Sequence, residues 1–111
     1  MAKRIGTTGR PSRVKVGPHW YEVDWFSRTQ SDASEKYGYC HMTDLQIGIC
    51  EHMPKSRQRQ TMLHEVLHAI HETMGLDDKS PEEDFTHRVA AGLALFITDN
   101  LAVWAWIGND T

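Results

Sequence analysis

The chain has 111 residues, of which 40% are hydrophobic and 24% charged, and its formal net charge is −3 at pH 7. This length suffices for one domain with a modest core and is too short for two. The negative balance does not favour a dedicated nucleic-acid binder, and no segment reaches the roughly 18 apolar residues of a membrane span. We therefore expect neither a nucleic acid nor a membrane as the partner. The oligomeric state stays open.

The first residues carry basic side chains and no acid. Five cations precede Glu22, the first acidic residue, and they are Lys3, Arg4, Arg10, Arg13 and Lys15. Together with Gly6, Gly9 and Pro11, this composition predicts a flexible basic arm over residues 1–12 and a single domain over residues 13–111. No hydrophobic run follows the basic start, so we expect no signal peptide and a cytoplasmic location.

The first half of the chain has the period of two that is typical of strands. Apolar and polar residues alternate on both sides of Gly17-Pro18, which predicts a β-hairpin over residues 14–25. Residues 27–36 contain no large apolar side chain and are expected to form a loop. Residues 37–49 predict one or two further strands around a turn at Thr43-Asp44.

The second half changes to helical spacing. Apolar residues three and four apart predict a helix over residues 56–74, ended by Gly75. Ser80 as N-cap, Pro81 as first helical residue and Glu83 in a capping box predict a second helix that reaches about Asn100. The expected fold class is α+β, a small, mainly antiparallel sheet followed by two packed helices.

Two features of the chain are left with alternatives. The tail from residue 101 either extends the second helix or folds back, and Trp104 and Trp106 are expected to cover the core rather than bind a partner. Cys40 and Cys50 are expected to be free thiols, although a disulfide between adjacent strands is the alternative.

The motif that indicates chemistry is His64-Glu65-Val66-Leu67-His68. On a helix, residues four apart lie one above the other on the same face, so both imidazoles can bind one zinc ion. Glu65 then lies beside a bound water and can act as a general base. The alternative is a chance match, because the chain contains seven histidines.

A catalytic zinc usually has three protein ligands, so a third is needed. His71 lies about 10 Å of helical rise from His64 and does not readily share a metal with it. On a helical wheel, Glu82 falls near the apolar stripe of the second helix, whereas Glu83 is expected in the capping box. Glu82 is therefore the predicted third ligand, the alternative being an acid that only favours the helix dipole.

Several other polar residues are candidates for roles near this motif. The spacing does not single out a second donor for the oxyanion, and the candidates are Tyr37, Tyr39, His41, His71 and His87. His19, His41 and His52 lie outside the two helices and are given no metal role. The cations Lys55, Arg57 and Arg59 are expected in the solvated first turn of the first helix, where contact with an acidic partner is conceivable.

The sheet, the helix with residues 60–70, and the acid-led second helix resemble the small zincin-type metallopeptidase-like proteins of bacteriophages and prophages, which look like minimal gluzincins. The resemblance implies zinc on His64, His68 and one of Glu82 and Glu83, with Glu65 catalytic. It also implies that residues 45–50 form an edge strand that pairs with an extended peptide. A second substrate-binding domain of the larger enzymes has no counterpart here.

These observations predict a zinc metallopeptidase that hydrolyses a peptide bond in a specific protein through a zinc-bound water, with Glu65 as general base. The first alternative is a zinc-binding structural or interaction module of phage origin with little or no turnover. The second is a metal-free domain with a fortuitous motif. The substrate's identity is beyond the sequence.

Overall fold

The computed structural model describes residues 10–77 and 79–108, so most of the expected arm lies outside the described residues. The elements follow one another along the chain as a mixed α and β series. They are β1 (Arg13–Val16), β2 (His19–Phe26), α1 (Arg28–Ser34), β3 (Gly38–His41), β4 (Gln46–Cys50), α2 (Lys55–Thr73), α3 (Glu82–Asp99) and α4 (Leu101–Ile107). The predicted α+β class is confirmed.

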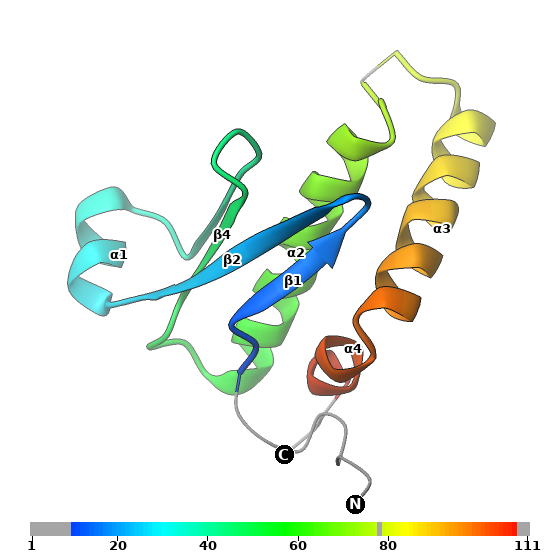
Figure 1. Cartoon of the computed structure of the whole chain (residues 1–111). Coiled ribbons are helices and arrows are strands. Elements are labelled where there is room, and N and C mark those ends of the chain that lie inside the picture. Colours follow the sequence, from blue (N-terminus) through cyan, green and yellow to red (C-terminus); the bar gives the residue numbers. More distant parts are fainter. Residues whose placement is uncertain (1–9, 78, 109–111) are drawn as a thin grey trace, which may run out of the picture.

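The four strands form one sheet in the order β1-β2-β4-β3. The β1–β2 and β4–β3 pairs are antiparallel, whereas β2 and β4 are parallel. The expectation that residues 45–50 form an edge strand is wrong, because β4 lies between β2 and β3. The chain reaches β4 through α1 and β3, and this crossover inserts β4 beside β2 and leaves β3 at the edge (Figure 1).

The predicted hairpin is confirmed. Gly17 has a φ of 58°, which glycine adopts without a Cβ penalty, and the register pairs Val16 with His19 directly across the turn. Val14 and Val16 are buried on the side that faces the helices, whereas Arg13 points to the other face and lies over the ring of Trp20.

The loop expected at residues 27–36 is in fact the short helix α1. Ser27 caps it in a capping box with Gln30, and Glu35 ends it in the left-handed conformation. Its one buried residue is Ser31, whose hydroxyl donates to the carbonyl of Lys36 over 2.6 Å. Local capping and polar contacts hold this helix, so it shows no apolar periodicity in the sequence.

The helix α2 ends as expected, because Gly75 has a φ of 67° and its N–H donates to the carbonyl of Glu72. The start of α3 differs from the predicted capping box. Pro81 is the N-cap without a side-chain hydrogen bond, and the Ser80 hydroxyl accepts instead from the N–H of Asp77. The Ser80 side chain therefore stabilises the turn before α3 and does not cap the helix.

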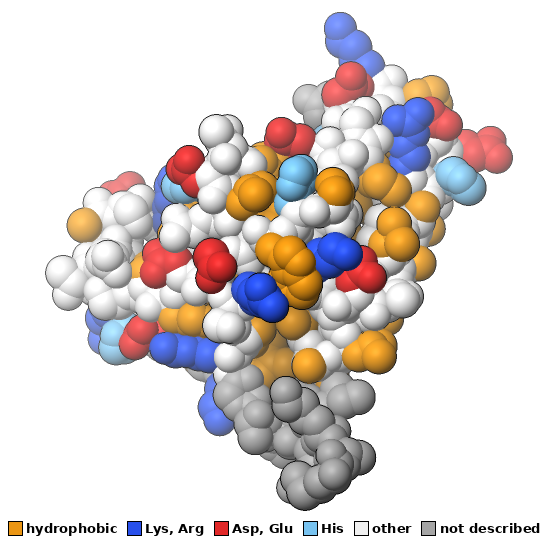
Figure 2. Space-filling model, in the orientation of Figure 1, with side chains coloured by type: hydrophobic (Ala, Val, Ile, Leu, Met, Phe, Trp, Pro, Cys, Tyr) orange, Lys and Arg blue, Asp and Glu red, His pale blue; other side chains and the backbone are white. Residues whose placement is uncertain are grey.

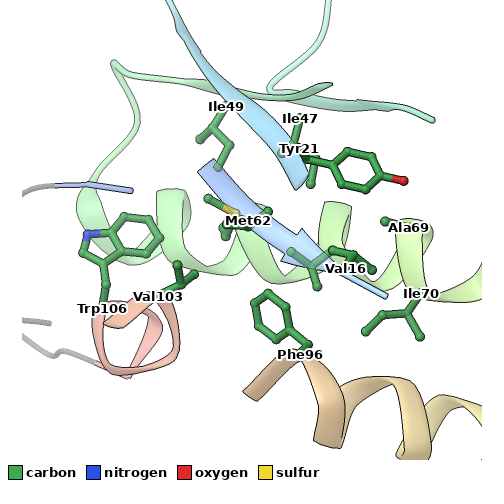
Figure 3. Packing of buried hydrophobic residues seen from close by; sticks show 12 residues of the cluster. Val16, Tyr21, Ile47, Ile49, Met62, Ala69, Ile70, Phe96, Val103 and Trp106 are labelled. Carbon is green, nitrogen blue, oxygen red and sulfur yellow. The ribbon is translucent and has the colours of Figure 1, made fainter. Parts of the chain in front are cut away.

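The core lies between one face of the sheet and the helices (Figure 3). Met62, Val66 and Ile70 of α2 are fully buried beneath Ile47 and Ile49 of β4. The other face of the sheet carries interspersed basic and acidic side chains, as the space-filling view shows (Figure 2). The central helix is therefore α2, which packs against the sheet on one side and against α3 on another.

The tail folds back at Asn100. Trp106 of α4 is 7% exposed and packs edge-on against Trp25, with ring centroids 5.7 Å apart, so it covers the core as expected. Trp104 is 37% exposed and does not. No single helix among the described residues could cross a membrane by length and composition, although α3 and α4 taken together pass that test with a 105° bend between them.

Two further expectations concern single side chains. Cys40 and Cys50 are free thiols, as predicted. Arg59 is not part of a solvated turn, because it is only 8% exposed and its guanidinium lies 5.9 Å from the centre of the Trp106 ring. The side chain of Arg59 is buried because α4 folds back beside it. The apolar spacing of α2 does not predict this contact, because α4 is a separate segment of the chain.

Candidate metal centre

The two histidines of the motif lie on the exposed side of α2 and point toward each other. Their Nε2 atoms are 3.1 Å apart and their ring centroids 4.8 Å apart. Both side chains are exposed, because this side of α2 is not covered by the sheet. The helix therefore presents two imidazole nitrogens at one point on its surface.

The separation of these nitrogens matches a shared metal ion. Two ligand nitrogens at about 2.05 Å from a tetrahedral zinc lie roughly 3.3 Å apart. The observed separation of 3.1 Å is slightly shorter, and a small rotation of the two side chains removes the difference. The imidazole pair thus fits a zinc ion without rearrangement of the helix.

Glu65 lies on the buried side of the motif, between α2 and the edge strand β3, and is 7% exposed. A Cβ on Gly38 of β3 would lie 3.0 Å from the Glu65 carboxylate and 2.5 Å from the Thr61 methyl group. The absence of a side chain at Gly38 is therefore what lets the strand approach the carboxylate.

Burial raises the pKa of Glu65, because a carboxylate removed from water is less stable than the neutral acid. The charges of His64, His68 and Lys36 oppose this rise. A carboxyl group with a raised pKa is a better proton acceptor than an ordinary surface carboxylate. Glu65 is thus suited to the role of a base.

His64, Glu65 and His68 form the one group of three or more potential metal ligands within the described part of the chain, and their ligand atoms lie within 4.8 Å of one another. The structure brings these three predicted residues together and does not bring Glu82 to them. Glu82 is exposed at the first residue of α3.

The packing of α3 on α2 explains the position of Glu82. The two helices run in opposite directions (Figure 1). Gly92 lies against Ile70 and Met74, near the C-terminal end of α2. Glu82 precedes Gly92 by ten residues, or about 15 Å of helix, in the direction away from the histidines. The helical wheel ignores this axial distance, so ligation by Glu82 stays a prediction.

The structure separates the five candidates for an oxyanion donor. The Tyr39 hydroxyl donates to Asp24 over 2.6 Å on the opposite face of the sheet, and His41 packs against the Tyr39 ring. His87 lines a separate cavity with Glu83 and Asp84. His71 and Tyr37 remain, since each lines a cavity that also contains His64.

Two cavities flank His64. One, of about 560 Å³, is mainly apolar and lies between α2 and α3, lined by Leu67, Phe85, Val89 and the three histidines His64, His68 and His71. The other, of about 240 Å³, is more polar and lies toward β3, lined by Tyr37, Gly38, Met53, Arg57, Gln60, Thr61, His64 and Glu65. His64 therefore lies between two cavities of different chemistry.

Sequence reasoning missed the contact of Gly38 with Glu65 and the polar cavity. A glycine inside a predicted strand indicates close backbone approach, so Gly38 carried a usable signal. The polar cavity carried none, because it depends on β3 being the edge strand. A scan against protein-family models found no matching family, and searches of curated proteins and of solved structures found no match.

Proposed function

We propose that this protein is a zinc-dependent peptidase of the zincin type that hydrolyses a bond in a protein or peptide. The observation that carries the proposal is the pair of imidazole nitrogens 3.1 Å apart, with a buried carboxylate on the next residue of the same helix. This combination supplies a metal site and a base at one place, which hydrolysis needs.

A zinc ion held by His64 and His68 would supply Lewis acidity, polarising a substrate carbonyl and lowering the pKa of water to about 7. Glu65 accepts the proton of the attacking water and transfers it to the leaving amine. β3 lies beside Glu65, whose carboxylate is mostly buried and lines the polar cavity. His71 and Tyr37 line the cavities on the two sides of His64, and we expect one of them to donate a hydrogen bond to the substrate.

The edge strand β3 supports a peptide as the substrate. One side of β3 pairs with β4, and Gly38 of β3 lies beside the Glu65 carboxylate. An extended peptide can add to the other side of such a strand through main-chain hydrogen bonds. Its bonds would then run past Glu65, where cleavage is proposed.

One observation favours the alternative of a zinc-binding interaction module. Leu67 and Phe85 line the apolar cavity and are each 38% exposed, as a protein-binding surface requires. A module of this kind would bind zinc and a partner without cleaving it.

Zinc content and the Glu65→Gln variant distinguish these functions. Purified protein should contain about one equivalent of zinc, and the His64→Ala/His68→Ala variant should contain none. Glu65→Gln should keep the zinc and lose at least about 100-fold in cleavage of a peptide library followed by mass spectrometry. Zinc binding without cleavage by the wild type would favour the module, and no zinc binding would exclude both functions.

The third ligand is tested by zinc affinity. If Glu82 binds the metal, Glu82→Ala weakens zinc by at least about tenfold, whereas Glu83→Ala is the matched control on the adjacent residue. If Glu65 is itself a ligand, Glu65→Gln weakens zinc instead. Competition titration against a chromophoric chelator measures all three variants, and a loss confined to Glu83→Ala would contradict the helical-wheel argument.

A further inference from the structure

Taking the proposed peptidase function as its premise, we infer that the site selects protein segments that carry an acidic side chain close to the cleaved bond, and that Arg57 recognises this side chain. The inference begins with the polar cavity of about 240 Å³ beside Glu65, because Arg57 lines it. A peptide on β3 would pass this cavity.

The cavity is rich in hydrogen-bond donors. Besides Arg57, its lining contains Tyr37 and Gln60, whose side chains carry a hydroxyl and an amide, and Thr61, whose hydroxyl donates to the Met53 sulfur. A carboxylate accepts hydrogen bonds and donates none, so it matches such a lining better than an amide or an ammonium does. The planar guanidinium also fits a carboxylate through two parallel hydrogen bonds.

Arg57 is available for this contact. It is exposed and forms no ion pair with any residue in the part of the chain that the structure describes, whereas Arg10 and Arg88 pair with Glu51 and Asp84. A second cation, Lys36, acts on Glu65 at the same side of α2. The buried Glu65 carboxyl is the one acid that lines the cavity, and Lys36 partly offsets its charge.

The cavity on the other side of His64 gives the site its second preference. Leu67, Phe85 and Val89 supply an apolar lining of larger volume, about 560 Å³. A segment that spans His64 therefore meets donors on the β3 side and apolar groups on the α3 side. The selected substrate combines one acidic and one large apolar side chain within a few residues.

The inference is tested with a random synthetic peptide library and zinc-loaded full-length protein. Peptides cleaved by the wild type, and peptides retained by Glu65→Gln, should show Asp or Glu enriched at one position. Arg57→Glu should lose this enrichment by about tenfold or more and favour Lys or Arg there. Lys55→Glu is the matched control, because it makes the same charge change on the same helix without lining the cavity.

The outcomes separate the two proposals. If the wild type cleaves without acidic preference, or if Arg57→Glu keeps the wild-type preference, the inference is overturned and the peptidase stands. If no peptide is cleaved although zinc is bound, the peptidase fails. The peptides retained by Glu65→Gln then decide the inference alone, and retention without acidic enrichment overturns it.

Discussion

Single residues decide how closely the edge strand approaches the rest of the molecule. Gly38 allows β3 to lie against Thr61 and Glu65, and Gly48 of β4 leaves the space that the Tyr39 ring fills. Tyr39 can then donate its hydrogen bond to Asp24 of β2. Two glycines thus position the strand that carries the proposed substrate.

The first prediction concerns Gly48. A Cβ there would overlap the Tyr39 ring, so Gly48→Ala should lower the free energy of unfolding by about 1–3 kcal/mol. Gly108→Ala is the control, because its Cβ would meet no atom closer than 3.7 Å. Urea denaturation measures both variants, and equal stabilities would show that the ring moves freely.

The second prediction concerns the pH dependence of Cys40. Burial, with the nearby charges of Glu65 and Glu72, raises the pKa of this thiol to about 11. Its alkylation in a Cys50→Ala background should therefore stay slow at pH 8 and increase with pH up to about 11. Iodoacetamide labelling followed by mass spectrometry measures the rate, and a plateau near pH 9 would contradict the prediction.

The same shift has a consequence for stability, and its sign follows from proton binding. Between the ordinary value of 9.0 and about 11, the folded thiol keeps its proton and the unfolded one loses it. The free energy of unfolding that this group contributes is therefore fully present below pH 9 and is lost as the pH rises toward 11. Cys40→Ala should show a smaller decrease over that interval than the wild type.

At the scale of elements, one buried amide links β1 to the junction of α3 and α4, in addition to the packing of the core. Asn100, 6% exposed, accepts from the N–H of Lys15 over 2.8 Å and donates to the carbonyls of Lys15 and Phe96 over 2.7 and 2.9 Å. It lies at the break between α3 and α4, so these bonds join β1 to both helices. The turn of the chain at this residue returns Trp106 to the core.

The third prediction follows from this junction. Asn100→Ala should lower the free energy of unfolding by about 2–3 kcal/mol, because it leaves the backbone groups of Lys15 without partners. Asp99→Ala is the neighbouring control and should change stability by at most about 0.5 kcal/mol, since its ion pair with Lys15 is long, 3.9 Å, and partly exposed. Similar losses in both variants would rule out the buried amide as the cause.

At the scale of the whole molecule, the candidate metal centre lies at the surface of the central helix. The sheet and α3 pack on two sides of α2 (Figure 1). His64 and His68 are exposed at the mouth of the cavity between α2 and α3. The core is therefore complete without the metal. Zinc should stabilise the folded protein through mass action and should not be required for folding.

The fourth prediction quantifies this stabilisation. Free zinc at 100 times its dissociation constant should raise the free energy of unfolding by about 2.7 kcal/mol, which corresponds to a Tm increase of roughly 10 °C for a chain of this size. Differential scanning calorimetry with zinc or a chelator measures the shift. The His64→Ala/His68→Ala variant should show none, and an equal shift in that variant would place the zinc elsewhere.

The sequence by itself determined the features that depend on local spacing. The hairpin strands and the pairing of His64 with His68 follow from periods of two and 3.6 residues, and the turn at Gly17 and the end of α2 follow from the positive φ of Gly17 and Gly75. Backbone geometry sets these periods wherever the element lies in the fold. The histidine pair was predictable because both ligands belong to one helix.

The tertiary structure alone decided the features that join distant segments. The parallel pairing of β4 with β2 left β3 at the edge, the level of α3 on α2 set the position of Glu82, and the bend at Asn100 returned Trp106 to the core beside Arg59. These outcomes depend on how whole elements pack. A periodic pattern shows which face of an element is buried, but it does not show which element covers that face or how far along its axis the contact lies.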